Sequence, residues 1–197
     1  MANGTFIRKI NNIEKKIVLN TFSEISGKVK SFFNENQNQF YVVIFKDDTT
    51  YKFPGIFFVS KSLIETFKKL NNKSKIVALG IYTGFMKHGQ FYLSIEGAEF
   101  LNNNHLIPED KKIYVKKDVE KSILYGNHID KMMISSLENF SKISIEKGKI
   151  IFLFSEINEL LSISLLTKNI DSFNKMNESD LIATNLIDKG YYLRKKQ

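Results

Sequence analysis

A chain of 197 residues with 43% hydrophobic and 13% aromatic residues can form a proper core, which excludes intrinsic disorder, and we expect two compact domains. The lack of cysteine excludes disulfides, thiolate metal sites and cysteine nucleophiles, and indicates a reducing interior compartment. The net charge of +8 favours a polyanionic partner, either RNA or an acidic membrane surface.

The first hundred residues show a pattern of helices and short strands. Apolar residues recur at three- to five-residue steps from Ile10 to Phe33, which predicts a long amphipathic helix that could break near Gly27. A turn at 47–48 and an N-cap at Ser60 for a second helix, which could end at Asn71–Asn72, separate the strands. The expected strands lie at 39–45, 51–59, 76–79, 81–86 and 90–95. This order predicts an α+β domain, with an antiparallel sheet flanked by helices.

A polar passage at 102–110, closed by Pro108, is the most linker-like part of the chain. We therefore expect an N-terminal α/β domain at 1–105 and a second domain at 106–197. A short helix at 118–124 precedes most of the strands of the second domain. Those strands are expected at 112–116, 143–145, 149–154, 160–166, 181–186 and 191–193. One helix with many short strands predicts a small, closed or half-closed barrel.

Residues for catalysis or metal binding do not cluster in the sequence. His88, His105 and His128 lie in separate segments, so we expect no metal and no cofactor. No nucleophile elbow or phosphate-binding loop is present, and we expect no enzyme activity. Gly80 and Gly84 are better explained by strand ends or bulges than by phosphate binding. No apolar run is long enough to span a membrane, and 1–10 lacks the apolar block of a signal peptide.

The segment Ser122–His128 carries the most specific local chemistry. Tyr125 can stack on a base, Gly126 permits close approach of a backbone, and Asn127 and His128 can hydrogen-bond an exposed base or ribose. The simpler alternative, a glycine that caps a helix C-terminus beside satisfied polar neighbours, is favoured on local chemistry alone.

The basic residues suit contact with phosphates rather than reading of base edges. Only Arg8 and Arg194 among the 29 basic residues are arginine. The lysines near the segment and the basic C-terminal end at 190–196 are suggestive of backbone binding without being specific. Charge does not single out either half, because the first part has a net charge of +6 and the second +2.

A resemblance to a known family extends over most of the chain. Phe58-Val-Ser60, Leu79-Gly80 with Gly84, and Phe91 with Leu93 match the first half of the pattern in order and spacing. The second half is matched by Val115–Lys117, Glu120, Ser122, Leu124–His128, Lys131, Asp188, Gly190, Tyr192 and Arg194. These positions resemble the nuclear-import-seven family of large-subunit ribosome assembly factors, which end in an RNA-binding PUA pseudo-barrel.

Three passages depart from that family's pattern. Residues 132–137 replace a glycine-rich, arginine-containing passage, and residues 180–187 are almost devoid of cations where some archaeal-type members carry an arginine and lysines. The first domain also has an insertion-like passage around 49–55.

The resemblance implies a non-catalytic factor that binds pre-ribosomal RNA through its PUA domain and supports processing of that RNA and assembly of the 60S subunit. The RNA would be U-rich or otherwise unpaired, and 60S assembly factors would bind the N-terminal domain. We expect a monomer in the nucleus and nucleolus, or in the cytoplasm of an archaeon, with no membrane contact. The expected RNA-binding residues are Lys121, Tyr125, Gly126, Asn127, His128, Lys131, Lys168, Lys175, Lys189, Arg194 and Lys195.

Two alternative functions remain on the sequence. PUA domains also position RNA for modification enzymes, so the chain could be an accessory subunit of an enzyme that modifies transfer or ribosomal RNA. It could instead be a protein adaptor whose basic surface only keeps it soluble or near RNA.

Overall fold

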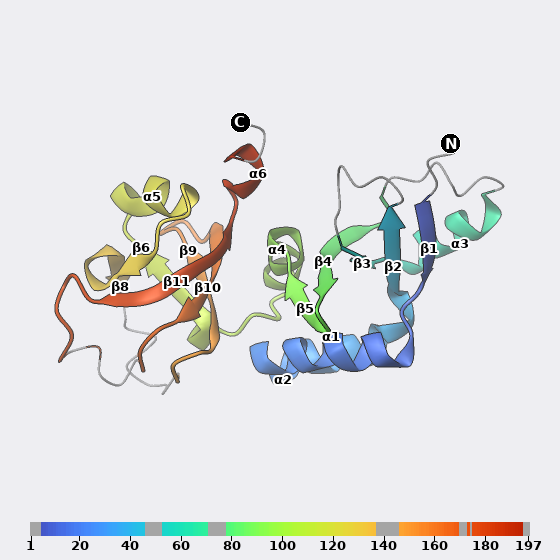
Figure 1. Ribbon diagram of the computed structural model, residues 1–197, viewed down its shortest axis with the longest axis horizontal. Coiled ribbons are helices and arrows are strands. Elements are labelled where there is room, and N and C mark those ends of the chain that lie inside the picture. Colours follow the sequence, from blue (N-terminus) through green and yellow to red (C-terminus); the bar gives the residue numbers. More distant parts are fainter. Residues whose placement is uncertain are drawn as a thin grey trace. The chain divides into compact units, whose positions relative to one another are not determined.

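The computed structural model describes residues 5–45, 53–70, 78–136, 146–169, 173 and 175–194. The chain divides into two compact units, Met1–Leu106 and Ile107–Gln197, a division one residue from the boundary expected on the sequence. Figure 1 shows both units, coloured along the chain. Among the described residues, no helix has the length and apolar character needed to cross a membrane.

The N-terminal unit is a five-stranded antiparallel sheet with helices on both faces. Its strands follow one another in space as they do in sequence: β1 (Thr5–Lys9), β2 (Phe40–Phe45), β3 (Gly55–Phe58), β4 (Ile81–Lys87) and β5 (Gln90–Leu93). Its helices are α1 (Asn12–Ile25), α2 (Gly27–Asn36), the 3₁₀ turn η1 (Gln37–Gln39), α3 (Lys61–Lys69) and α4 (Ile95–Asn103). The expected antiparallel sheet flanked by helices is confirmed, whereas β1 was not expected.

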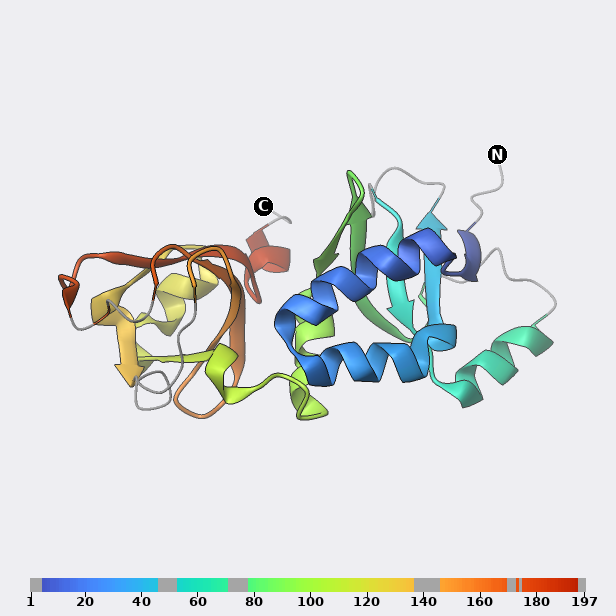
Figure 2. The same ribbon diagram turned by 90° about the horizontal axis from the view of Figure 1, so that it is seen from below.

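Alternation along the strands decides which helix covers which face. The ring of Phe40 contacts Phe22 of α1 and Phe33 of α2, while its neighbour Tyr41 contacts Phe67 of α3. Because successive strand side chains point to opposite faces, α1 and α2 cover one face and α3 the other. Figure 2 shows α1 and α2 side by side on their face.

The expected break in the first helix is confirmed at Ser26. This residue is extended (φ −168°, ψ 163°) and serves both as the C-cap of α1 and as the N-cap of α2. Its hydroxyl accepts the Val29 N–H at 3.1 Å and donates to the Leu106 carbonyl at 3.1 Å. At the other end of α1, Asn11 and Glu14 form a capping box. The Ser60 N-cap of α3 is confirmed as well.

The helix α4 was not expected, because the sequence analysis placed a strand at 90–95 and a linker at 102–110. Ser94 caps α4 by accepting the Gly97 N–H at 3.0 Å. A glycine inside a helix costs about 1 kcal/mol, which weakens the helical pattern. The tertiary structure requires the glycine at this position, because a Cβ at Gly97 would lie 2.4 Å from the Thr83 carbonyl oxygen on β4.

The C-terminal unit is a six-stranded, nearly closed barrel with one short helix. Its sheet has the order β7-β11-β10-β9-β6-β8, and within the described part of this unit only the pair β6·β9 is parallel. The strands are β6 (Lys112–Val115), β7 (Ile129–Asp130), β8 (Ile134–Ser136), β9 (Ile150–Phe154), β10 (Leu160–Leu166) and β11 (Leu181–Asp188). The helical segments are η2 (Glu109–Lys111), η3 (Lys117–Val119), α5 (Glu120–Leu124), η4 (Lys131–Met133) and α6 (Tyr191–Arg194).

The core of this unit lies inside the barrel and below α5. Ile123 of α5 is fully buried, and it belongs to the same apolar cluster as Leu153 of β9, Leu161 of β10 and Ile182 of β11. Burial of the inner face of α5 therefore leaves its C-terminal end and the following loop at the surface.

The strand expected at 191–193 is wrong, because this segment is the helix α6. The Arg194 N–H donates to the Gly190 carbonyl at 3.1 Å, which closes a helical turn. An extended segment would carry position 194 roughly 20 Å away from Asp188, whereas the turn returns the guanidinium to that carboxylate. The short strands β7 and β8 were also not expected.

Several expected features lie outside the described residues. They are the turn at 47–48, the helix end at 71–72, the strand at 143–145 and the first half of the strand at 76–79. The second half of that last strand, Ala78 and Leu79, forms no regular strand.

Candidate nucleic-acid interface

The loop Tyr125–His128 begins as the C-terminal cap of α5. The Gly126 N–H donates to the Ile123 carbonyl at 2.8 Å, and the Asn127 N–H donates to the Ser122 carbonyl at 3.2 Å. These two bonds form a Schellman motif, and Gly126 has the positive φ (+88°) that the motif requires. The helix-capping interpretation of the glycine is therefore confirmed, and the cap directs the chain out of the helix immediately after Tyr125.

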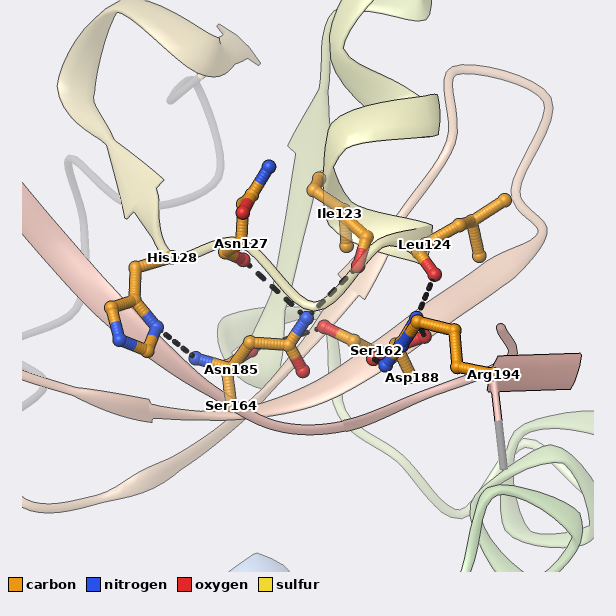
Figure 3. A network of polar contacts seen from close by, with 9 residues as sticks. All are labelled: Ile123, Leu124, Asn127, His128, Ser162, Ser164, Asn185, Asp188 and Arg194. Carbon is orange, nitrogen blue, oxygen red and sulfur yellow. Dashed lines mark hydrogen bonds and ion pairs between the residues drawn. The ribbon is translucent and has the colours of Figure 1, made fainter. Parts of the chain in front are cut away.

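Asn185 on β11 holds this loop from below (Figure 3). Its Nδ2 donates to the Ile123 carbonyl at 3.0 Å and to the Asn127 carbonyl at 3.4 Å, and its backbone N–H donates to Nδ1 of His128 at 3.3 Å. Two carbonyl partners fix the orientation of the amide, because a flipped amide would point its oxygen at both of them. The Oδ1 atom is left buried without a hydrogen-bond partner in the described residues.

Arg194 connects the C-terminal helix α6 to the same loop. Its guanidinium forms a bidentate ion pair with Asp188, at 2.9 and 2.7 Å, and donates to the Leu124 carbonyl at the end of α5. The hydrogen bond to Asp188 raises the pKa of Arg194. Gly190 is needed here, because a Cβ would lie 2.0 Å from the Leu124 carbonyl oxygen. The aspartate, glycine and arginine of the family pattern thus form one clasp.

Above this polar network, the loop presents an aromatic and a cationic group to solvent. The Tyr125 side chain is 62% exposed, and Nζ of Lys121 lies 5.9 Å from the centroid of its ring. Asn127 and His128 are exposed beside them. A rigid backbone that carries an exposed ring next to a cation is suited to stacking an unpaired base.

Comparison with known proteins agrees with this geometry. Residues 111–197 match the family described as the UPF0113 PUA domain. The 60S ribosome subunit biogenesis protein NIP7 of Saccharomyces cerevisiae is 26% identical over 189 residues, which cover 95% of this chain and 96% of that protein. The resemblance to the nuclear-import-seven family is confirmed. The NIP7 homologue of Rattus norvegicus is 24% identical over 86% of this chain and 91% of its own length.

Solved structures show the same fold over both units. A conserved PUA domain protein from Thermoplasma acidophilum has a TM-score of 0.54 and 14% identity, and the match covers 97% of this chain and 99% of that one. A PUA domain structure from Aeropyrum pernix has a TM-score of 0.60 and 10% identity, over 94% of this chain and 87% of its own. The C-terminal unit is accordingly the expected PUA pseudo-barrel.

Eight of the eleven expected RNA-binding residues fall into two groups. Lys121, the loop and Arg194 lie near the C-terminal end of β11. Lys131 and Lys168 lie near its N-terminal end, where both approach Asp180. Eight strand residues separate these ends by about 23 Å. The two groups therefore do not form a single patch around the loop.

Lys131 and Lys168 already have partners within the domain. The Lys131 side chain is only 16% exposed, and its Nζ donates to the Met176 carbonyl at 2.7 Å and lies 5.2 Å from the centroid of the Phe173 ring. Lys168 forms an ion pair with Asp180 at 3.1 Å, and this hydrogen bond lowers the pKa of the carboxylate. Both lysines therefore have a structural role that the sequence did not indicate.

The remaining cations are more scattered. Lys175 is exposed, Lys189 is half-buried with its N–H bonded to the Leu161 carbonyl, and Lys195 lies outside the described residues. Asn185 was missed by the sequence analysis. An amide side chain within the otherwise mostly apolar strand 181–187 was the signal that could have found it.

Proposed function

We propose that the chain is a non-catalytic factor for assembly of the large ribosomal subunit that binds unpaired precursor RNA through its PUA domain. The observation that carries the proposal is the loop Tyr125–His128, held rigidly from below and open above. Similarity along nearly the whole length to proteins named as 60S biogenesis factors supports the assembly context.

The contact group that we propose is Lys121, Tyr125, Asn127 and His128. Tyr125 stacks on one base, while the amide and imidazole bond to its edge or to the ribose. Lys121 neutralises a neighbouring phosphate. Lys175, Lys189 and Lys195 then extend the contact along the RNA backbone, whereas Lys168 is held by Asp180.

Gly126 and Arg194 have a different part in this proposal. Gly126 closes the helix cap, and Arg194 is occupied by Asp188 and the Leu124 carbonyl. Both therefore position the loop rather than touch the RNA. Lys131, which is mostly buried, supports the far end of β11 in the same way.

The N-terminal unit serves in this proposal as the docking site for other assembly factors, and the protein acts in the nucleus and nucleolus. These assignments rest on what the resemblance to the nuclear-import-seven family implies.

Ultraviolet cross-linking in the native cells, followed by sequencing of the attached RNA, tests the proposal. Enrichment over a stretch of large-subunit precursor RNA, lost in a Tyr125→Ala variant, is the expected result. Ile157→Ala is the matched control, because Ile157 is an apolar side chain that is 78% exposed on the β9–β10 turn. Enrichment over transfer RNA would point to the modification-accessory function instead, and no enrichment to the protein adaptor.

A further inference from the structure

Three aromatic rings stack across neighbouring segments of the N-terminal sheet. Phe53, Phe85 and Tyr92, named here the aromatic ladder, have centroid distances of 5.7 Å (Phe53–Phe85) and 5.2 Å (Phe85–Tyr92). The interplanar angles are 20° and 11°, so the rings are nearly parallel. Phe85 and Tyr92 are direct cross-strand partners on β4 and β5, and Phe53 immediately precedes Pro54 and β3.

The ladder lies on the face of the sheet that α3 covers only in part. In the strand register, Val43 is opposite Gly55, and Gly55 is opposite Phe85. The apolar cluster packed under α3 contains Val43, but neither Phe85 nor Tyr92. Tyr92 is 40% exposed, so the end of this face that carries the ladder remains in contact with solvent.

The sheet ends at Tyr92, and this leaves one face of the stack open. β5 is the last strand in the sheet order, and so none of the strands among the described residues carries a further ring beyond it. The Tyr92 hydroxyl donates to Oε1 of Gln90 at 2.9 Å, which holds the ring in place. A planar ligand can continue the stack on the outer face of Tyr92 without ordering a loose side chain.

The charge around the ladder is compatible with RNA. Nζ of Lys87 lies 5.0 Å from the centroid of the Phe53 ring, and Lys87 is the only charged residue in β3, β4 and β5. The turn between β4 and β5 adds His88, which is exposed. The first 106 residues hold 14 basic and 8 acidic residues, a net charge of +6. A phosphate beside this ladder would meet the Lys87 ammonium and no carboxylate from these strands.

Size distinguishes a nucleotide from a protein partner at this patch. A stable protein interface buries roughly 800 Å² on each side. Three stacked rings, only one of them exposed by as much as 40%, offer much less area. We propose that the aromatic ladder is a second RNA-binding site, which stacks one unpaired base on Tyr92. A single base is about the size of the one ring, Tyr92, that ends the ladder.

The lack of tryptophan in the chain permits a direct test. A Tyr92→Trp variant of the full chain places a sole indole at the end of the ladder. Titration with a single-stranded oligouridine of about 20 nucleotides should quench its fluorescence, because a stacked base contacts the ring. The matched control is Ile13→Trp, at a position on α1 that is 70% exposed, and its fluorescence should not change. Repeating both titrations with Tyr125→Ala added separates this site from the loop of the PUA domain.

Affinity gives the second measurement. Tyr92→Ala should weaken binding of the same RNA about 5- to 150-fold, the range for loss of one stacked base. Tyr92→Phe, which keeps the ring and loses only its hydrogen bond to Gln90, should weaken binding much less. Unchanged affinity and no quenching, in a protein that still binds RNA, would overturn the second site and leave the proposed function intact. If the Tyr92→Ala protein kept its RNA affinity but was lost from pre-ribosomal particles, the ladder would be a protein-docking site, and the proposal of a second RNA site would again be overturned. If the unchanged protein bound no RNA, both proposals would fail.

Discussion

The substitution Gly126→Ala separates the role of the helix cap from that of backbone conformation alone. Gly126 has φ +88°, and Gly148 in the turn before β9 has φ +84°. A methyl group costs about 1–2 kcal/mol in this left-handed region, offset by about 0.4–1 kcal/mol because alanine restricts the unfolded chain. The backbone effect alone should therefore lower the free energy of unfolding by about 1 kcal/mol for alanine at either position.

The surroundings of the two glycines differ. A Cβ at Gly148 meets nothing within 4 Å, whereas a Cβ at Gly126 lies 3.1 Å from Nη2 of Arg194 and 3.7 Å from Oδ2 of Asp188. The guanidinium cannot withdraw without lengthening its ion pair with Asp188. We therefore expect Gly126→Ala to destabilise the protein more than Gly148→Ala does, by at least about 0.5 kcal/mol, which exceeds the usual error of such comparisons.

Urea unfolding of the full chain, followed by circular dichroism, measures the difference. With a slope of about 1–3 kcal/mol per molar urea, a loss of 1 kcal/mol moves the midpoint by roughly 0.3–1 M. Gly126→Ala should also weaken RNA binding, because the cap sets the direction of Tyr125, while Gly148→Ala should not. Equal midpoints together with equal RNA affinities for the two variants would refute the clasp as the support of the loop.

Three further outcomes are expected. Ser26→Ala should lower the free energy of unfolding by about 1–2 kcal/mol in urea, because it removes the N-cap of α2. Burial by itself would raise the pKa of Glu14, but hydrogen bonds from Arg8 and the capped backbone outweigh it and lower that pKa. Stability from this carboxylate is thus present above its unfolded pKa of about 4.3 and lost as the pH falls through the lower folded value; unfolding of Glu14→Gln between pH 2 and 6 should lack this loss. Lys121→Gln should reduce the slope of log RNA affinity against log salt concentration by about 0.7, whereas Lys131→Gln should leave that slope unchanged. Equal slopes for the two variants would remove Lys121 from the contact group.

Much of the architecture could be predicted from local pattern. The break near Gly27, the Ser60 cap and the long strand β10 were expected where the structure has them, because capping and strand alternation depend on neighbouring residues. The helix-capping role of Gly126 follows from the same local chemistry. A family resemblance based on residues in order and spacing predicted the PUA pseudo-barrel.

Two misses have a tertiary cause. The helix α4 contains a glycine that the pattern disfavours, and the Thr83 carbonyl on β4 explains why no larger residue fits there. The last aromatic run, Tyr191–Leu193, has strand propensity, yet it forms a helical turn because Arg194 pairs with Asp188. In both segments a contact with a residue far away in sequence, or a pairing across a turn, outweighs the local preference.

The sequence by itself determined the basic charge of this protein, and it predicted many of the longer helices and strands and the loop that we propose for RNA binding. Only the tertiary structure decided which cations are available to bind RNA. In the sequence, Lys131 and Arg194 resemble Lys121, but in the structure Lys131 pairs with Glu178 and Arg194 pairs with Asp188. It also revealed Asn185 beneath the loop and the stacking of Phe53, Phe85 and Tyr92. The physical reason is that a charge or a ring acquires its role from its neighbours in space, and strand register brings those neighbours together from distant parts of the chain.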